Sequence, residues 1–315
     1  MKSVLSAKHF HDEAAAYSYV EARLWPTGPT CPHCGGVERI SKMEGKSTRI
    51  GVYKCYQCRK PFRVTVGTIF ESSHIKLHIW LQAIALLSSS KKGISANQLH
   101  RTLGIGLKAA WFLSHRIREA MRDGDLSPMG GGGEIIEADE TYLWKSSVRR
   151  PSKKRGNLPF TRGGNVGTAG KRAIVSLVQR GGGVRSFHVE NADKMTIGEI
   201  VTKNISEEAR VMTDESKIYG DVAGMVAKHE RIQHRAREYV RGDVHTNTVE
   251  GYFSVFKRGM KGVYQHCAEK HLHRYLAEFD FRYSNRVALG VNDQARADRA
   301  LKGVVGKRLT YRTIN

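Results

Sequence analysis

The sequence has no long hydrophobic run. Its longest apolar stretch, IWLQAIALL at residues 79–87, has nine residues and contains Gln82, whereas a membrane-spanning helix needs about 20 apolar residues. The N-terminal stretch MKSVLSAKHFHDEAAAY contains acids and histidines where a secretory signal needs an uninterrupted apolar core. We therefore expect a protein that stays inside the cell and has no membrane partner.

Acidic residues are scarce. The 315 residues include 30 Asp and Glu against 52 Lys and Arg, which gives a formal charge of +22 and a pI of about 9.9. A positive charge of this size indicates a polyanionic partner, and nucleic acid is the first candidate. The length and the hydrophobic content of 40% allow a sizeable core and suggest two or three domains.

Cysteine is also rare, and four of the five cysteines form two C-x2-C pairs separated by twenty residues. This spacing lets two turns present four thiolates to one Zn²⁺, so we expect a zinc ribbon at residues 29–72. Two disulfides are the alternative, which an intracellular chain disfavours. The fifth cysteine, Cys267, is expected to be buried rather than nucleophilic. The expected zinc ligands are Cys31, Cys34, Cys55 and Cys58.

The ribbon segment is rich in cations, which favours DNA contact, although a purely structural ribbon stays open as an alternative. These cations are Arg39, Lys42, Lys46, Arg49, Lys54, Arg59, Lys60 and Arg63. A helical lead-in at residues 1–28 precedes the ribbon. Residues 73–127 have helical periodicity, and Ser95 followed by Gln98 predicts the start of the middle helix. Within this region, residues 95–121 have the length of a helix-turn-helix, with Gly104 and Gly106 in the turn. The cations of its second helix are expected to face DNA. They are Lys108, His115, Arg116, Arg118 and Arg122.

The stretch PMGGGG at residues 128–133 predicts a flexible linker and a domain boundary. Residues 134–288 then read as the strand EIIEADETYLW, two strands joined by the glycines at 181–183, a helix, a fourth strand and further helices. This order predicts a mixed sheet with flanking helices, because the helix makes a crossover connection. Residues 289–315 are expected to form a polar, peripheral tail. The predicted fold class is α/β, in several domains.

Three carboxylates occupy distinctive positions. The apolar strands EIIEADET and ARVMTDES each meet an acid near the carboxyl end, at Asp139 and Asp214, and Glu250 is the only acid in the basic helical stretch HTNTVEGYFSVFKRG. Side chains at strand ends are rigid and reach solvent, and Mg²⁺ prefers oxygen ligands. We expect these three acids to hold a pair of Mg²⁺ or Mn²⁺ ions for in-line displacement at phosphorus.

Residues close to the three carboxylates in the sequence are expected to have other roles. Asn247 faces the same way as Glu250 and is the alternative third ligand. Glu137 shares a strand face with the first aspartate, and we expect a solvated edge residue there rather than an outer support of the site. Glu140 and Glu215 are expected to be surface charges.

Cations follow the third acid. Lys257 lies on the same helical face as Glu250, roughly 10 Å along the axis, where it can bind a DNA phosphate beside the cleavage point. Arg258 and Lys261 extend this phosphate-binding track. The stretch from Trp144 to Arg172 has nine basic residues and no acid. It is interpreted as a flexible DNA-tracking arm, with a solvated basic loop as the alternative.

Several motifs, taken together, are specific: CPHCGG with YKCYQCRKPF, FLSHRIREAM, IEADETYLW, VMTDES, HTNTVEGYFSVFKRG and HLHRYLAEFDFRYSNR. Over residues 15–286 the chain resembles the bacterial insertion-sequence transposases of the ISXO2-like group. Those enzymes join an N-terminal zinc ribbon to an RNase H-like DDE core. The resemblance implies that Asp139, Asp214 and Glu250 are the catalytic triad and that Lys257 is the lysine of an E-x6-K pattern. Some relatives use Asn or His in the third position, which keeps Asn247 and His245 as alternatives.

The resemblance further implies recognition of terminal inverted repeats by the N-terminal domains, oligomeric action on paired ends, and a place in the bacterial cytoplasm beside the nucleoid. The predicted function is that of a DNA transposase. Water attacks a phosphodiester at the element end, and the freed 3′-hydroxyl then attacks target DNA. Two alternatives stay open. One is a non-catalytic zinc-ribbon DNA-binding protein, and the other is a metal-dependent nuclease without strand transfer.

Overall fold

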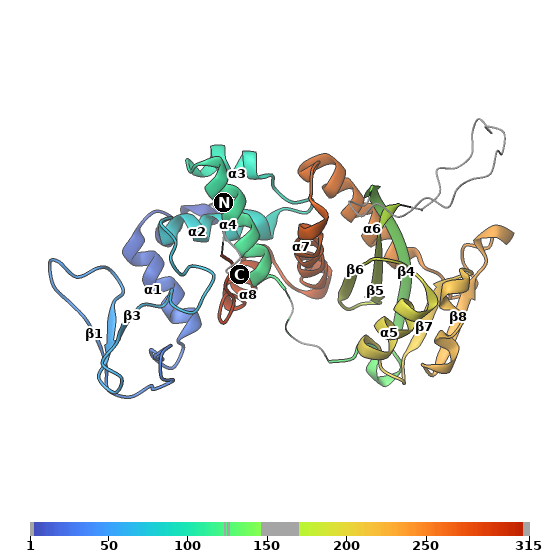
Figure 1. Ribbon diagram of the computed structural model, residues 1–315, viewed down its shortest axis with the longest axis horizontal. Helices are drawn as coiled ribbons and strands as arrows, with labels where there is room; N and C mark the ends of the chain where they lie inside the picture. The colour runs from blue at the N-terminus through green and yellow to red at the C-terminus, as the bar shows by residue number, and fades with distance from the viewer. Residues whose placement is uncertain (1–2, 123, 125–126, 146–169, 311–315) are drawn as a thin grey trace. The chain divides into compact units, whose positions relative to one another are not determined.

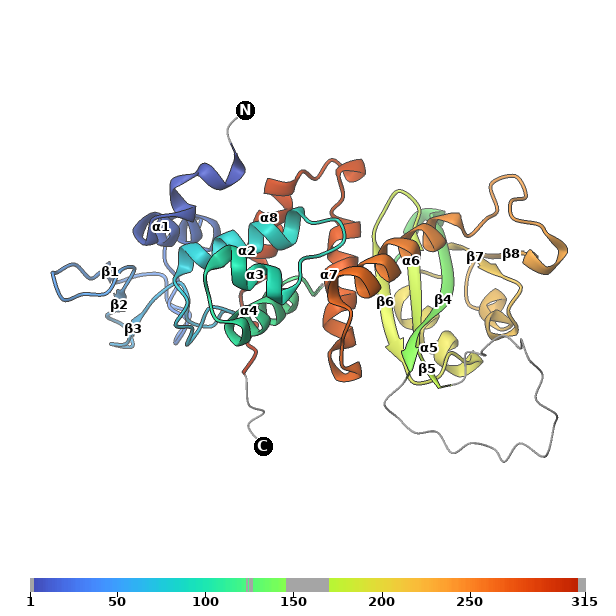
Figure 2. The same cartoon turned by 90° about the horizontal axis from the view of Figure 1, so that it is seen from above.

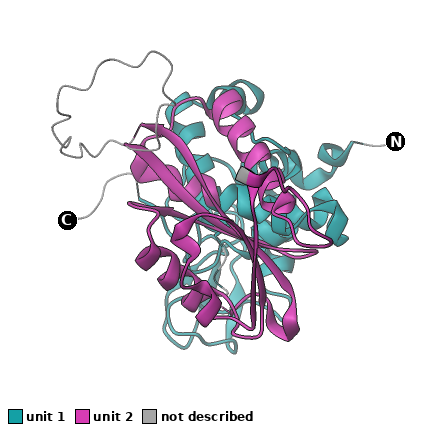
Figure 3. Cartoon of the chain, turned by 90° about the vertical axis from the view of Figure 1, so that its right-hand side faces the viewer, with its two compact units in different colours: residues 1–124, 277–315 teal, residues 125–276 magenta. Residues whose placement is uncertain are grey.

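The computed structural model describes residues 3–122, 124, 127–145 and 170–310 (Figure 1). Most of the predicted DNA-tracking arm, residues 146–169, lies outside them. The chain divides into two compact units (Figure 3), which we call the helical unit, residues 1–124 with 277–315, and the sheet unit, residues 125–276. None of the helices in the described part of the chain combines the length and the apolar character that crossing a bilayer requires.

Five helices of the helical unit surround one apolar core. They are α1 (Glu13–Leu24), α2 (Leu77–Ser89), α3 (Ala96–Leu103), α4 (Leu107–Ala120) and α8 (Asp293–Lys302). Helix α3 begins at Ser95, whose hydroxyl accepts the amide of Gln98 at 3.1 Å, as the sequence predicts. It ends at Gly104, whose φ of 64° suits glycine. Helix α7 (Leu272–Ser284) includes residues of both units.

The expectation that the cations of α4 face DNA is wrong for three of them. His115, Arg116 and Arg118 are 0%, 5% and 2% exposed. Arg116 donates to the carbonyl of Glu71 at 2.5 Å, and Arg118 Nε donates to Glu278 at 2.6 Å. Helix α4 lies in the core of the helical unit, and Arg116 and Arg118 are buried there beside oxygen atoms that accept their hydrogen bonds.

The C-terminal segment is not peripheral. Ala300, Leu301 and Val304 are buried in the same apolar core as α1 and α2. Asp298 on α8 accepts Arg23 Nε and the hydroxyl of Tyr19, both at 2.7 Å. The polar composition of this segment hid an amphipathic helix whose narrow apolar face completes the helical unit.

A small antiparallel sheet follows α1. Its strands, in the order β1-β2-β3, are β1 (Ile40–Lys42), β2 (Tyr53–Cys55) and β3 (Pro61–Phe62). Few residues are buried here, chiefly Cys31, Cys55 and Phe62. A core of this size supplies little hydrophobic stabilisation, so small folds of this kind depend on a metal.

The sheet unit contains one mixed five-stranded sheet in the order β6-β5-β4-β7-β8. Its strands are β4 (Ile135–Lys145), β5 (Lys171–Gln179), β6 (Val184–Val189), β7 (Arg210–Asp214) and β8 (Lys228–Ile232). Strands β4, β5 and β6 are antiparallel neighbours, whereas β7 runs parallel to both β4 and β8. The glycines at 181–183 join β5 to β6, and α5 (Lys194–Asn204) makes the crossover before β7. The predicted α/β class is confirmed.

Opposite faces of this sheet carry different helices. Ile136 and Ala138 of β4 pack with Ile197 and Val201 of α5 in one apolar cluster. Side chains alternate along a strand, so the intervening residues of β4 face the other way, toward α6 (Asn247–Gly259). Figure 2 shows α6 running across β5 and β4.

The start of the glycine run at residues 128–133 is packed. The amide of Met129 donates to Asn204 at 2.8 Å, and its carbonyl accepts the amide of Ser206 at 2.8 Å. Gly130 has φ 82° and lies against Ala209, so a Cβ there would clash. These residues extend the sheet unit at the end of α5.

Candidate active site and zinc centre

Four cysteines of the ribbon converge. The Sγ atoms of Cys31 and Cys58 are 3.6 Å apart, those of Cys34 and Cys55 are 3.7 Å apart, and all four lie within 4.8 Å of one another. A Zn–S bond of about 2.3 Å places tetrahedral sulfurs about 3.8 Å apart. The spacing fits zinc and excludes a disulfide, whose sulfurs are about 2.05 Å apart. The predicted zinc ligand set is therefore brought together.

Hydrogen bonds favour the thiolate form of Cys55, whereas burial and the three neighbouring thiols raise the pKa of Cys34. The backbone amide of Cys58 donates to Cys55, which lowers the pKa of that thiol to about 7. A thiolate is the form that binds zinc.

Removing one thiolate is expected to remove the zinc. We predict that Cys34→Ser loses the bound zinc and unfolds the ribbon, because the few buried residues of the ribbon cannot hold it without metal. Metal content and limited proteolysis check this result. Cys267→Ser is the matched control, since Cys267 is buried in the sheet unit, and it should retain zinc. Full zinc content in Cys34→Ser would contradict the prediction.

The sheet places the two aspartates side by side. Glu137 of β4 is paired with Met212 of β7 in parallel register. Two residues further along each strand are Asp139 and Asp214, which therefore share one face, the face toward α6. Strand β7 ends at Asp214, as predicted, and the predicted strand EIIEADETYLW corresponds to β4, which continues to Lys145. Asp139 is therefore in the middle of β4, and the expectation that it lies near the carboxyl end of the strand is wrong. Asp139 instead lies where pairing with β7 stops and one side of β4 becomes open.

Asp139 lies in a strongly negative environment. Burial, followed by the charges of Glu140, Asp214 and Glu250, raises its pKa to about 8. Lys257 is close enough for its charge to interact with Asp139, although burial and Lys261 lower the pKa of this lysine. The three predicted acids and the predicted lysine therefore lie within electrostatic range of one another.

Glu250 comes from helix α6, one turn from its start. Its Oε1 accepts the hydroxyl of Thr246 at 2.9 Å and lies 3.7 Å from His234 Nε2. The side chain is 49% exposed, which leaves it accessible to solvent. Among the described residues, only the four cysteines form a set of three or more His, Cys, Asp or Glu whose ligand atoms all lie within 4.8 Å. The three acids are more widely spaced, with carboxylate oxygens as the donor type that Mg²⁺ and Mn²⁺ prefer.

An open cleft lies beside Asp214. It is lined by Glu140, Asp214, Glu215, Ser216 and Lys217. Glu140 accepts the hydroxyl of Tyr219 at 2.8 Å, and burial raises its pKa. Glu215 accepts the amide of His234 at 2.7 Å. The expectation of a surface charge is therefore wrong for Glu140, whereas Glu215 is half-buried at the edge of this open cleft.

Glu137 is a residue whose role the sequence did not reveal. Its side chain is 0% exposed, so the expectation of a solvated edge residue is wrong. It accepts Arg180 Nε at 2.5 Å and the amides of Thr248 and Val249 at 2.7 and 3.0 Å. The sequence pattern that could have revealed this role is an acid two residues before Asp139 in an apolar strand, together with an arginine at a later glycine turn.

The two alternative third ligands are placed differently. His245 Nδ1 accepts from Arg180 at 2.8 Å and lies 3.3 Å from Glu137, inside the buried cluster. Asn247 is exposed at the first position of α6. His245 is thus engaged by Arg180 beside Glu137, whereas Asn247 stays a candidate beside Glu250.

The raised pKa of Asp139 predicts a pH effect on stability. Between the ordinary value of 3.8 and about 8, the folded chain holds a proton that the unfolded chain releases. The free energy of unfolding should therefore fall as pH rises through this window, by up to about 1.4 kcal/mol per pH unit. Denaturant titrations at pH 6, 7 and 8 without added Mg²⁺ or Mn²⁺ measure it. Asp139→Asn should flatten the slope, and an unchanged slope in that variant would contradict the assignment.

Comparison with known proteins gives a consistent picture. Residues 131–284 match the family described as ISXO2-like transposase domain, and residues 11–61 match the transposase zinc-ribbon domain. An uncharacterized protein in the transposable element ISH50 of Halobacterium salinarum is 27% identical over 286 residues, which is 89% of this chain and 93% of that protein. The Mos1 transposase paired-end complex with left transposon end aligns over 67% of this chain and 77% of its own, at 12% identity. Its TM-score of 0.19 is too low to support an argument about fold.

Proposed function

Since this chain belongs to the transposases that join a transposase zinc ribbon to an ISXO2-like transposase domain, we propose that it cuts DNA at the ends of its insertion element and joins them to target DNA. The cofactor is Mg²⁺ or Mn²⁺, held by Asp139, Asp214 and Glu250. The observation that carries the proposal is that Asp139 and Asp214 lie on one face of the neighbouring strands β4 and β7, with Glu250 of α6 close enough for its charge to act on Asp139. We also assign the sheet to the RNase H-like arrangement.

The chemistry proposed for the site is in-line displacement at phosphorus. A pair of divalent ions supplies activation of the attacking oxygen and stabilisation of the leaving oxygen when bound. Asp139 and Asp214 hold this site from adjacent strands, and Glu250 closes it from the helix. Lys257, Arg258 and Lys261 hold the phosphates on either side of the cleavage point, so the reacting phosphodiester is oriented by the chain itself.

DNA binding by the N-terminal part is proposed from charge and exposure. Six ribbon cations are exposed: Arg39, Lys42, Lys46, Arg49, Arg59 and Lys60. In the turn region, Arg101 and Lys108 are exposed while the inner cations of α4 are buried. We therefore assign contact with the terminal repeats to the ribbon and to α3 with the first turn of α4. Action on paired ends by several copies of the chain is proposed with it.

The test is a cleavage and joining assay with the full-length protein, Mg²⁺ and DNA that carries the native element ends. Glu250→Gln and Asn247→Ala are compared side by side. We expect Glu250→Gln to abolish both steps and Asn247→Ala to retain them. Loss in Asn247→Ala alone would make Asn247 the third ligand. Absence of any Mg²⁺-dependent cleavage by the wild-type protein would overturn the proposal.

A pre-cleaved end separates the transposase from a nuclease. Joining of that end to target DNA requires attack by a 3′-hydroxyl, whereas a nuclease uses only water. We expect joined product. DNA binding without cleavage or joining would leave the non-catalytic DNA-binding protein as the function.

Lys257 is expected to act on DNA rather than on the metal. Lys257→Ala should weaken binding to an element end by about tenfold, which corresponds to the loss of one charge-assisted contact. It should also lower the slope of log affinity against log salt by about one. Binding measured over a salt series checks both effects. Lys257→Arg is the control that retains the charge, and a fall in Mn²⁺ affinity as large as in the aspartate variants would contradict the phosphate role.

A further inference from the structure

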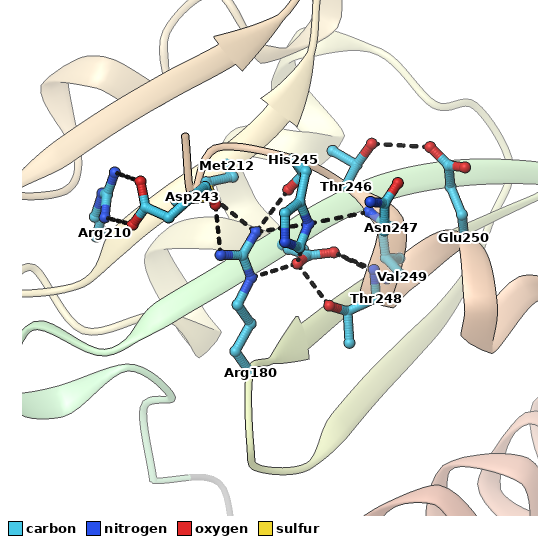
Figure 4. Close-up of polar contacts among 11 residues, drawn as sticks. Arg180, Arg210, Met212, Asp243, His245, Thr246, Asn247, Thr248, Val249 and Glu250 are labelled. Atoms are coloured by element: carbon cyan, nitrogen blue, oxygen red, sulfur yellow. Dashed lines mark hydrogen bonds and ion pairs between the residues drawn. The ribbon is translucent and has the colours of Figure 1, made fainter. Parts of the chain in front are cut away.

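We infer that Glu137 and Arg180 position the helix that carries Glu250, and that this placement sets the affinity of the acidic site for a divalent cation. The inference rests on the proposed function, because it concerns the support of the proposed ligands. Neither residue touches DNA or metal in this scheme, so both are positioning residues. Figure 4 shows Arg180 beside His245 and the first residues of α6.

The start of α6 is capped from another element. Thr246 is the N-cap residue, but its side chain makes no cap hydrogen bond and donates instead to Glu250. Glu137 Oε2 accepts the amides of Thr248 and Val249, the second and third residues of the helix, at 2.7 and 3.0 Å. These amides lack partners within a helix and carry partial positive charge, so a carboxylate stabilises them. Strand β4 thus caps α6 directly.

Arg180 compensates the charge of Glu137 and fixes the approach to the helix. Its Nε donates to Glu137 Oε1 at 2.5 Å, where the hydroxyl of Thr248 also donates at 2.7 Å. The two terminal nitrogens of Arg180 donate to the carbonyl of Asp243 at 2.7 Å and to Nδ1 and the carbonyl of His245 at 2.8 and 2.9 Å. A fully buried carboxylate without such partners would be costly. One guanidinium therefore holds both the cap and the segment that leads into α6.

A second anchor ties the same helix to the sheet. The hydroxyl of Tyr252 is 2.9 Å from Ser186 Oγ, which is 2.8 Å from Ser176 Oγ. Ser176 is the register partner of Asp139. Tyr252 thus holds the middle of α6, and the contact with Glu137 fixes its first turn.

The geometry connects this cap to the metal ligands. Glu137 and Asp139 lie on one face of β4, about 7 Å apart along the strand. Glu250 follows Val249, whose amide Glu137 holds. Metal ligands must be held to a few tenths of an ångström, and loss of an outer partner typically costs 10–100-fold in metal affinity. The cap therefore sets the distance between the strand ligand and the helix ligand.

The test is Mn²⁺ binding by the full-length, zinc-loaded protein without DNA, followed by electron paramagnetic resonance. Glu137→Gln preserves the shape but removes the charge and one acceptor oxygen. Its Kd for Mn²⁺ is expected to rise by about tenfold or more. Affinity for an element-end DNA should stay unchanged, and cleavage should require more Mn²⁺ for half of its maximal rate. Arg180→Lys is the second variant and is expected to act in the same direction, since lysine cannot make the forked contacts.

Glu278→Gln is the matched control, because Glu278 is another fully buried carboxylate paired with an arginine, in the helical unit. Glu278→Gln should lower the stability of the protein and leave its Kd for Mn²⁺ unchanged, which is the result expected for a residue with a structural role alone. If Glu137→Gln binds Mn²⁺ like wild type, the inference is overturned. If that variant does not fold, Arg180→Lys decides: a raised Kd supports the inference and an unchanged Kd overturns it. Failure of the wild-type protein to bind Mn²⁺ would instead remove the proposed metal site itself.

Discussion

Asp139→Asn is expected to slow Mg²⁺-dependent cleavage of an element end by about a thousandfold or more, with unchanged affinity for the uncleaved end. The variant keeps the size of the side chain and removes the charge that holds the cation. Charge stabilisation by such an ion is worth several kcal/mol, and each 1.36 kcal/mol is a factor of ten in rate. Asp214→Asn should behave in the same way, because the two residues share one face of adjacent strands. Single-turnover cleavage and gel-shift binding measure the two quantities separately.

The control for this pair is Glu207→Gln, which removes an exposed acid of the sheet unit and should cleave at the wild-type rate. Charge removal as such also strengthens attraction to DNA, so the control shows whether binding changes for that general reason. An equal loss of binding and cleavage in Asp139→Asn would count against a catalytic role. Cleavage by Asp139→Asn near the wild-type rate would exclude a catalytic role for Asp139.

Glu278→Ala is expected to destabilise the helical unit by about 3–5 kcal/mol, since it leaves two buried guanidinium groups without their shared acid. Glu278 is 0% exposed, and its partners Arg118 and Arg282 are 2% and 7% exposed. Glu278 joins α7 to α4 through Arg118 Nε at 2.6 Å. Chemical denaturation of the full-length protein measures the loss, with the transition of each unit followed separately because two units need not unfold together.

An exposed ion pair provides the comparison. Glu199 and Lys203 are four residues apart on α5, and Lys203 Nζ lies 3.2 Å from Glu199 Oε2. The side chain of Lys203 is 72% exposed and that of Glu199 is 64% exposed. Glu199→Gln should leave both transitions unchanged, because solvent screens such pairs. If Glu278→Ala were as mild as Glu199→Gln, the buried cluster would not be a source of stability.

Elements with a local cause were predictable from sequence. The spacing of the cysteines predicted the ligand cluster, the capping serine predicted the start of α3, and the glycines at 181–183 predicted the β5–β6 turn. Apolar strands that contain an acid located Asp139 and Asp214. The strand EIIEADETYLW was predicted over nearly the whole of β4, but Asp139 was placed near its carboxyl end, although Thr, Tyr, Leu and Trp follow it.

Features that depend on distant segments were not predictable. Glu137 is buried only because residues 248 and 249, more than a hundred positions later, cover it with their amides. Arg118 becomes a core residue through an acid 160 positions away. In the sequence, a charged residue in an apolar segment looks the same whether its side chain faces solvent or a buried partner. From the sequence alone, Glu137 was therefore assigned to the surface and Arg118 to DNA contact.

The helical unit takes its core from both ends of the chain, with Asp298 of α8 bonded to Arg23 and Tyr19 of α1. During synthesis the sheet unit leaves the ribosome complete while the helical unit still lacks its final helix. A gene copy interrupted before codon 293 would therefore encode an intact set of proposed metal ligands next to an incompletely folded helical unit. The order of the chain thus places completion of the helical unit after completion of the proposed metal site.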